Sequence, residues 1–327
     1  MTNSNTIEQY GTAFISHLES KIKTKEPKNL YEPINYILGL GGKRLRPILT
    51  LMTADLFGGN FKDALDSAMA IEIFHNFSLV HDDIMDDAPL RRGKTTVHEK
   101  WDVNTGILSG DAMLINSYQF FESYSPEIFK KLTSLFSKTA IEVCEGQQYD
   151  VDFESRDDVT IPEYLKMIEY KTAVLVAAAM KMGAIIANAS QDDTEAIYEF
   201  GKNLGIAFQL QDDYLDVFGD PETFGKQVGG DIIENKKTFL FLKSLEYAEK
   251  EQREGLLHLY SLKPEDSGTK VETVKSIFME SGAVKEAKKE INGYTQKAFD
   301  ALTTISIPDA NKAILKQFGE NLMKRTV

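Results

Sequence analysis

Two short segments of the chain carry aspartates at helical spacing. Residues 78–87 read SLVHDDIMDD and residues 209–216 read QLQDDYLD, so each contains Asp-Asp-x-x-Asp. Residues four apart lie on one face of a helix, and like charges there repel unless something neutralises them. The apolar neighbours predict that both helices are largely buried, where carboxylates need counter-charges. Mg²⁺ has oxygen ligands and bridges carboxylates to phosphate, so we predict magnesium sites. The facing pairs are Asp82 with Asp86 and Asp212 with Asp216.

Three alternatives compete with this interpretation. A solvated acidic face is common in an acidic chain, but two clusters embedded in apolar helix favour metal. A calcium loop needs alternating Asp or Asn ligands around a glycine, and Leu215 occupies a ligand place if counting starts at Asp213. A di-iron bundle needs Glu-x-x-His pairs, and neither cluster contains one.

Basic residues that suit phosphate lie near the first cluster. The segment GGKRLRP, residues 41–47, is expected to open a helix, and helix N-termini attract anions. Lys43 and Arg46 are three apart and can face one way. The planar guanidinium of arginine matches phosphate oxygens, and a pair of arginines follows the first cluster. That pair is Arg91 and Arg92.

Further candidates are ordinary when taken singly. His75 lies seven residues before Asp82 and shares roughly its helix face, although a lone buried histidine is as often a core residue. Lys171-Thr172 and Lys226 add two cations and a hydroxyl, and a surface ion pair is the default role of a lone lysine.

Composition narrows the class of protein. The 327 residues are 42% hydrophobic and 27% charged, as in a globular protein, and the net charge of −13 argues against nucleic acid as the main partner. The one cysteine, Cys144, cannot form an internal disulfide, which indicates a reducing, cytoplasmic setting, and we expect it to be a small buried residue. The most apolar stretch, residues 172–189, is interrupted by Lys181 and is interpreted as an interior helix rather than a membrane span.

Helical periodicity runs through nearly the whole chain, and no long strand-like alternation occurs. We therefore predict an all-α protein: residues 1–327 form a single domain, a bundle of about a dozen helices. The helices are expected near residues 5–24, 44–57, 63–87, 103–123, 127–153, 161–188, 192–218, 235–260, 270–280, 283–304 and 310–324.

Five motifs together resemble the trans-prenyl diphosphate synthases, the family of farnesyl and geranylgeranyl diphosphate synthases. They occur in the family's order and spacing between about residues 41 and 237, and they read GGKRLRP, HNFSLVHDDIMDDAPLRRG, YKTA, FQLQDDYLDVFGD and GKQVGGDIIENKKT. The resemblance implies an isoprenoid synthase fold around a central cavity, three Mg²⁺ per active site and a homodimer. It implies condensation of isopentenyl diphosphate with an allylic diphosphate, which is dimethylallyl, geranyl or farnesyl diphosphate.

The resemblance also implies residue roles. Magnesium would be bound by Asp82 and Asp86, by Asp212 on the facing helix, and by Asp83 and Asp216 in support. Isopentenyl diphosphate would be held by Lys43, Arg46, His75 and Arg92. The allylic diphosphate would be held by Arg91, Lys171, Lys226 and Lys236. Oxygens near the developing cation would come from Thr172 and Gln209. The chain ends in Met323–Val327 with two cations, so a basic tail that closes the site is not expected.

Two other functions remain open. A class I terpene cyclase typically replaces the second cluster with an Asn/Ser/Glu pattern and needs no site for isopentenyl diphosphate. A non-catalytic subunit of a heteromeric synthase usually loses one cluster, and this chain has both.

Product length is expected to depend on residues upstream of the first cluster. Phe77 precedes Asp82 by five residues, about 7–8 Å along a helix, so its ring can close a tunnel, whereas Ser78 leaves room. Phe74, one turn further along the helix, is a second candidate for closing the tunnel, although core packing alone would explain both aromatics. An aromatic only at the fifth position resembles geranylgeranyl-type pockets, so we expect a C20 product, with C15 close behind.

Overall fold

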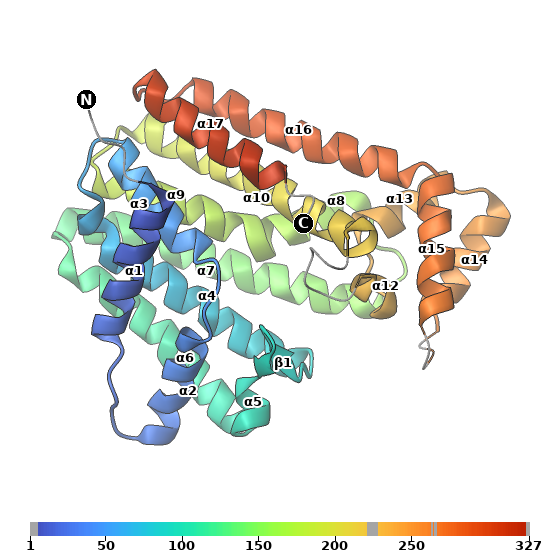
Figure 1. Ribbon diagram of the computed structural model, residues 1–327, viewed down its shortest axis with the longest axis horizontal. Coiled ribbons are helices and arrows are strands. Elements are labelled where there is room, and N and C mark those ends of the chain that lie inside the picture. Colours follow the sequence, from blue (N-terminus) through green and yellow to red (C-terminus); the bar gives the residue numbers. More distant parts are fainter. Residues whose placement is uncertain (1–5, 221–227, 263, 265–266, 325–327) are drawn as a thin grey trace. The chain divides into compact units, whose positions relative to one another are not determined.

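The computed structural model describes residues 6–220, 228–262, 264 and 267–324, and nearly all of its regular structure is helical (Figure 1). The predicted all-α class is confirmed. The chain forms two compact units, here called unit 1 (Met1–Ser137 and Ala178–Glu195) and unit 2 (Lys138–Ala177 and Ala196–Val327). Their boundaries fall within three helices, α7 (Pro126–Ser155), α9 (Val174–Ile186) and α10 (Gln191–Phe218).

Unit 1 is built around one buried helix, α4. Both α3 and α6 pack against α4, and α1 and α2 add further contacts. The other elements of this unit are α1 (Ile7–Lys21), α2 (Lys28–Gly39), α3 (Leu45–Leu56), η1 (Phe61–Ala64), α4 (Leu65–Met85), β1 (Leu90–Arg91), β2 (Lys94–Thr95), α5 (Val97–Lys100), α6 (Val103–Gln119) and η2 (Phe120–Ser123).

Local sequence signals explain where several of these elements begin. Thr6 and Gln9 form a capping box at the start of α1, and the Asp102 side chain accepts a hydrogen bond from the Thr105 amide at the start of α6. The β1–β2 hairpin turns at Arg92 and Gly93, whose φ angles are 54° and 71°. Positive φ at both central residues is the geometry that matches the twist of a two-residue hairpin.

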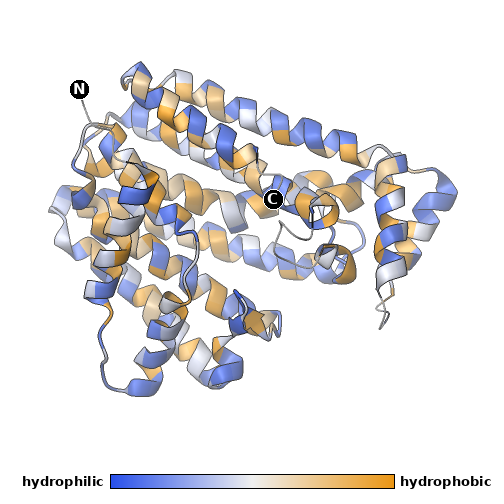
Figure 2. Ribbon diagram, in the orientation of Figure 1, coloured by the Kyte–Doolittle hydropathy of each residue, from blue (hydrophilic) through white to orange (hydrophobic). Residues whose placement is uncertain are grey.

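Unit 2 contains the helices of the C-terminal part of the chain. Its core includes the fully buried side chains of Tyr164, Phe239 and Phe278. Hydrophobic and hydrophilic residues alternate along α16 (Figure 2), and the buried positions Ala283, Ala287 and Ile291 follow the helical period. The elements are α8 (Ile161–Ile168), the π-helical turn η3 (Glu169–Ala173), α12 (Gly230–Ile233), α13 (Phe239–Tyr247), α14 (Lys250–Tyr260), α15 (Gly268–Glu280), α16 (Ala283–Thr303) and α17 (Asp309–Met323).

Several predicted boundaries were wrong for identifiable reasons. Helix α2 was not predicted, because Pro33 lies inside it and proline removes a backbone donor. The helix expected over 161–188 is interrupted by η3, and the one expected over 235–260 begins at Phe239 and is split between Tyr247 and Lys250. Cys144 is exposed on α7 rather than buried.

Two further predictions concern the chain as a whole. Among the described residues, no helix is both long enough and apolar enough to span a membrane. Residues Val174–Met180 of the apolar stretch are buried side by side in α9, as an interior helix requires. The organisation as a single domain stays a prediction.

Candidate active site

The glycine-rich segment before α3 takes a backbone path that separates its three cations. The φ angles of Gly41, Gly42 and Arg44 are 81°, 123° and 47°, and α3 begins only at Leu45. Lys43 therefore precedes the helix and is exposed, while Arg46 lies in the first helical turn and is partly buried. Residue 43 is not helical, so helical spacing does not relate Lys43 to Arg46, and that the two cations face one way stays a prediction.

Three of the residues predicted to hold isopentenyl diphosphate gather beside this segment. Arg46 Nη1 lies 3.2 Å from His75 Nε2. Arg92, at the hairpin turn, donates a hydrogen bond through Nη1 to the Gly41 carbonyl. A Cβ atom at Gly42 would lie only 3.0 Å from Cζ of Arg92, so glycine leaves the space that the guanidinium occupies.

This group forms a cationic cluster within unit 1. Burial, followed by repulsion from Arg46, Arg92, Arg91 and Arg44, holds the pKa of His75 well below its usual value, so the imidazole is neutral at pH 7. Burial lowers the pKa of Arg46, against an opposing effect of the Glu72 charge and with a further lowering by Arg92. Burial and then the Arg44 charge lower the pKa of Arg92. An anion bound between these groups would relieve both the repulsion and the desolvation.

Sequence reasoning missed the structural role of Arg44. The residue is 7% exposed, and its guanidinium donates to the Glu72 carboxylate and to the Leu38 carbonyl. Glu72 also accepts from Asn76 at 3.0 Å. This buried ion pair joins α3 to α4, and removing one partner of such a pair costs about 3–5 kcal/mol. The sequence feature that could have revealed this role is Glu72, an acidic residue in the middle of an otherwise apolar helical segment.

The first aspartate cluster lies at the C-terminal end of α4. Asp86 caps the helix and Asp83 is 1% exposed. Arg91 Nε donates to Asp83 Oδ1 at 2.9 Å, and Arg91 Nη2 lies 3.4 Å from Asp82 Oδ2. Although burial alone would lower it, these carboxylates raise the pKa of Arg91. The hairpin arginine therefore orients the cluster from one side.

The donor set of this cluster fits a hard divalent cation. The Oδ2 atom of Asp83 is buried and has no hydrogen-bond partner. Burial, with a smaller effect from the Asp82 charge, raises the pKa of Asp83 despite its ion pair with Arg91. Carboxylate oxygens are the ligands that Mg²⁺ prefers, and a cation here would offset the repulsion among the three acids.

The second aspartate cluster lies on α10 in unit 2, where a hydrogen-bonded chain holds it. The Thr172 hydroxyl donates to Gln209 Oε1 at 3.1 Å, and Gln209 Nε2 donates to Asp213 Oδ1 at 2.9 Å. Tyr164 donates to the other oxygen of Asp213. The predicted pair Thr172 and Gln209 is thus brought together, and Asp213 anchors it.

A further carboxylate that we did not predict joins this cluster. The Asp231 amide donates to Asp216 Oδ2 at 3.0 Å, which places the start of α12 against α10. Burial and then the charges of Asp213 and Asp216 raise the pKa of Asp231 to about 8. Burial raises the pKa of Asp213 to about 6. Crowded buried acids of this kind are neutralised by a cation, so these residues too fit a divalent ion.

Two predicted lysines lie near acidic partners of unit 2. Lys171, in the π-helical turn, donates to Asp150 Oδ2 at 2.6 Å. A Cβ atom at Gly146 would lie 2.2 Å from the Lys171 amide nitrogen, so glycine allows α7 to approach this turn. Lys236 Nζ lies 2.8 Å from Glu234 and 3.8 Å from Asp231. Lys226 lies outside the described residues, as do the last residues of the C-terminal tail, 325–327.

The two phenylalanines predicted to limit product length belong to a cluster of aromatic rings in unit 1. The Phe77 ring lies 5.5 Å from Phe74 and 4.8 Å from His81, and Phe74 lies 5.1 Å from Phe136. Ser78 donates its hydroxyl to the His75 carbonyl at 2.8 Å. Phe77 is 8% exposed and Phe74 is fully buried, and Phe77 is the nearer of the two to Asp82 along α4.

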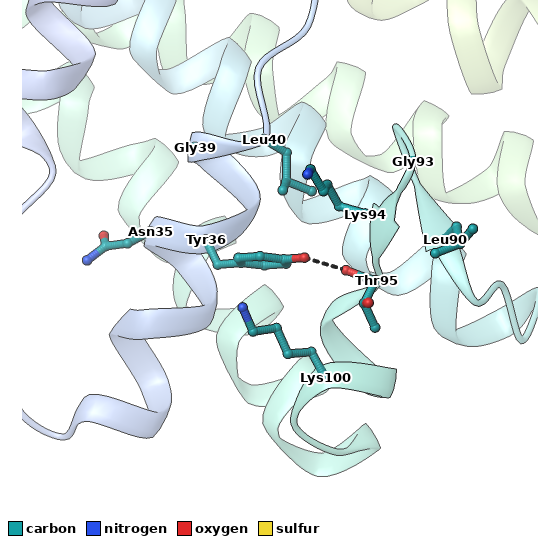
Figure 3. Close-up of a pocket in the computed structure, with 9 residues that line it drawn as sticks. All are labelled: Asn35, Tyr36, Gly39, Leu40, Leu90, Gly93, Lys94, Thr95 and Lys100. Atoms are coloured by element: carbon teal, nitrogen blue, oxygen red, sulfur yellow. Dashed lines mark hydrogen bonds between the residues drawn. The ribbon is translucent and has the colours of Figure 1, made fainter. Parts of the chain in front are cut away.

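An open pocket lined by residues of α2, the β1–β2 hairpin and α5 contains none of the predicted residues. It has a volume of about 700 Å³ and is lined partly by Tyr36, Lys94 and Lys100 (Figure 3). The Tyr36 hydroxyl donates to the Thr95 carbonyl at 2.7 Å, which ties α2 to β2. This contact supports the hairpin that carries Arg91 and Arg92.

Comparison with known proteins gives a consistent result. The family model for polyprenyl synthetases matches residues 27–278. The chain is 36% identical over 309 residues to the short chain isoprenyl diphosphate synthase of Methanothermobacter thermautotrophicus, covering 94% of each chain. It is 55% identical to a geranylgeranyl pyrophosphate synthase of known crystal structure, with a TM-score of 0.95, covering 98% of this chain and 99% of that one.

A more distant structure carries ligands. The polyprenyl synthase of Caulobacter crescentus was crystallised with calcium and isoprenyl diphosphate. It is 26% identical to this chain and has a TM-score of 0.86, with 100% of both chains covered.

Proposed function

Because the chain belongs to the polyprenyl synthetase family, we propose that it makes geranylgeranyl diphosphate (C20) from isopentenyl diphosphate and an allylic diphosphate, with farnesyl diphosphate (C15) as the next most favoured product. The observation that carries the proposal is the cationic cluster of Arg46, His75 and Arg92. Arg46 lies 3.2 Å from His75, Arg92 donates to the adjoining Gly41 carbonyl, and a bound diphosphate would offset this concentration of positive charge. The names of the relatives support a short product.

We assign the isopentenyl diphosphate site to Lys43, Arg46, His75 and Arg92. The neutral imidazole can donate one hydrogen bond to phosphate, and the arginines provide charge. Arg91, Lys171, Lys226 and Lys236 are assigned to the allylic diphosphate. The exposure of Lys43 lets its long side chain move onto a phosphate, whereas Arg46 is already positioned by His75.

The proposed magnesium ligands are Asp82, Asp86 and Asp212, with Asp83 and Asp216 in support, for three ions per site. Magnesium would neutralise charge on the allylic diphosphate as the carbon–oxygen bond breaks. The Caulobacter relative, crystallised with calcium and isoprenyl diphosphate, supports a divalent ion beside a diphosphate. Asp213 is already hydrogen-bonded through both oxygens and is assigned a positioning role.

The side chains then carry the reaction by position and charge. The lysines and Arg91 stabilise the negative charge that develops on the leaving diphosphate. The Thr172 hydroxyl and the Gln209 amide place oxygen dipoles towards the allylic cation. The C3=C4 double bond of isopentenyl diphosphate attacks that cation and forms the new carbon–carbon bond. The released diphosphate accepts the proton from C2, since no side chain of the motifs is an obvious base.

One assay tests the proposal against its alternatives. Purified protein is incubated with labelled isopentenyl diphosphate, Mg²⁺ and, in turn, dimethylallyl, geranyl or farnesyl diphosphate. We expect incorporation of label into a C20 diphosphate with each primer. Hydrocarbon formed from the allylic diphosphate alone would indicate a terpene cyclase, and inactivity until a second protein is added would indicate a subunit. A product that stops at C15 would overturn the length assignment.

A further inference from the structure

A buried histidine beside the first aspartate cluster has no assigned task. His98, in the first turn of α5, is 7% exposed, and neither of its ring nitrogens has a hydrogen-bond partner. Nε2 faces the Glu99 carboxylate, whose Oε1 lies 3.8 Å away, beyond hydrogen-bond distance. Buried imidazole nitrogens are normally satisfied, so this side chain calls for a ligand.

Two carboxylates complete a group around this imidazole. One ligand atom from each of Asp87, His98 and Glu99 lies within 4.8 Å of the others. Around one tetrahedral ion, ligand atoms lie about 3.4 Å apart, as follows from metal–ligand distances of about 2.1 Å. The side chains of Asp87 and Glu99 are exposed and can rotate inward, whereas His98 is fixed by burial.

We propose that Asp87, His98 and Glu99 bind a transition-metal dication of the Zn²⁺ class, at a site separate from the magnesium ligands. An imidazole nitrogen with two carboxylate oxygens suits Zn²⁺ and its neighbours, whereas Mg²⁺ prefers oxygen ligands and retains its waters. With three protein ligands, water would fill the fourth position.

The place of the site in the chain indicates what the ion would do. Asp87 follows the end of α4 and His98 is the second residue of α5, so the ion would join the two ends of the segment that contains the β1–β2 hairpin. The Thr96 hydroxyl and amide already donate to the carbonyls of Ala88 and Pro89, at 2.8 and 3.1 Å. The ion would clamp the base of the hairpin that carries Arg91 and Arg92. This proposal does not depend on the proposed product or substrates.

The first test is calorimetric titration of the untagged full-length protein with Zn²⁺ in a large excess of Mg²⁺, which occupies the all-oxygen sites. We expect one zinc ion per chain. Asp87→Asn and Glu99→Gln should each weaken binding at least tenfold, and His98→Gln should abolish it. His258→Gln, which changes an exposed histidine on α14, is the matched control and should bind zinc like the wild type.

Two further measurements test the zinc site even if His98→Gln fails to fold. The double variant Asp87→Asn/Glu99→Gln changes only exposed side chains and should lose zinc binding while retaining its circular dichroism spectrum. Zinc should slow hydrogen exchange of backbone amides 88–96 in the wild type and not in this double variant. Absence of zinc binding under excess Mg²⁺, or equal binding by wild type and double variant, would overturn the site.

Discussion

Arg46 Nη1 on α3 lies 3.2 Å from His75 Nε2 on α4, with both side chains partly buried. Because an arginine is always charged and can only donate, the facing imidazole nitrogen must accept, which requires neutral histidine. This agrees with the depressed pKa of His75. The contact places a fixed positive charge where we propose that isopentenyl diphosphate binds.

Replacing this arginine should affect one substrate more than the other. Arg46→Ala should raise the apparent KM for isopentenyl diphosphate about ten- to hundredfold, because a charge-assisted hydrogen bond contributes about 1.5–3 kcal/mol. The KM for the allylic substrate should change much less. Steady-state kinetics with each substrate varied in turn measure both values. Arg253→Ala, on the exposed face of α14, is the control, and equal effects on both substrates would contradict the assignment.

The neutral state of His75 predicts how stability changes with pH. Its folded pKa is below its unfolded value of about 6.5, so the unfolded state binds more protons as the pH falls below 6.5. Stability is therefore lost on acidification, by up to about 1.4 kcal/mol per pH unit until the folded pKa is reached. Urea unfolding at pH 8, 6 and 5 should show a smaller acid loss for His75→Gln than for the wild type. Parallel pH profiles would show that His75 titrates normally.

The carboxylates proposed to bind magnesium should matter mainly for turnover. Asp82→Ala and Asp212→Ala should each reduce kcat by several orders of magnitude, because each removes a ligand that is most important as leaving-group charge develops. Circular dichroism should show intact helices. Asp192→Ala, an exposed position in the first turn of α10, is the control. Near-normal turnover of either variant with magnesium present would disprove its role, and chelation of metal should inactivate the wild type.

The two phenylalanines on α4 predict a change in product. Phe77→Ala should lengthen the main product by at least one isoprene unit, because it removes the ring that lies ahead of Phe74. Phe77→Leu, which leaves more of the volume, should shift the distribution less. Thin-layer or liquid chromatography of the dephosphorylated products measures this. Phe129→Ala, at an exposed position, serves as the control. Identical products from wild type and Phe77→Ala would show that Phe77 does not limit product length.

Two exposed apolar residues on α6 offer a test of the predicted homodimer. Leu108 and Ile115 lie seven residues apart on α6, the helix packed against α4, and their exposures are 59% and 61%. Leu108→Asp with Ile115→Asp should convert a dimer to a monomer, because burying two new charges opposes association. Light scattering at micromolar concentration gives the mass. Met279→Asp, at an exposed position of α15, is the control, and a monomeric wild type would exclude the dimer.

Local spacing accounts for what could be predicted. The all-α class follows from helical periodicity, which depends on neighbours in the chain, while the pairing of carboxylates four residues apart stays a prediction. The assignment of His75 and Arg46 to the same substrate came from the family's motifs rather than from spacing. Asp231 was missed although its motif was quoted, because nothing local says that its amide contacts Asp216.

The amino-acid sequence by itself determined the helices and the types of residue at the site, because periodicity and capping act over a few residues. Only the tertiary structure decided the burial and the contacts of the three neighbouring cations. Arg44 is buried against Glu72, Arg46 contacts His75 and Lys43 stays exposed. The difference arises from the left-handed backbone at Arg44 and from partners about thirty residues away on α4, and neither is encoded in the local run of basic residues.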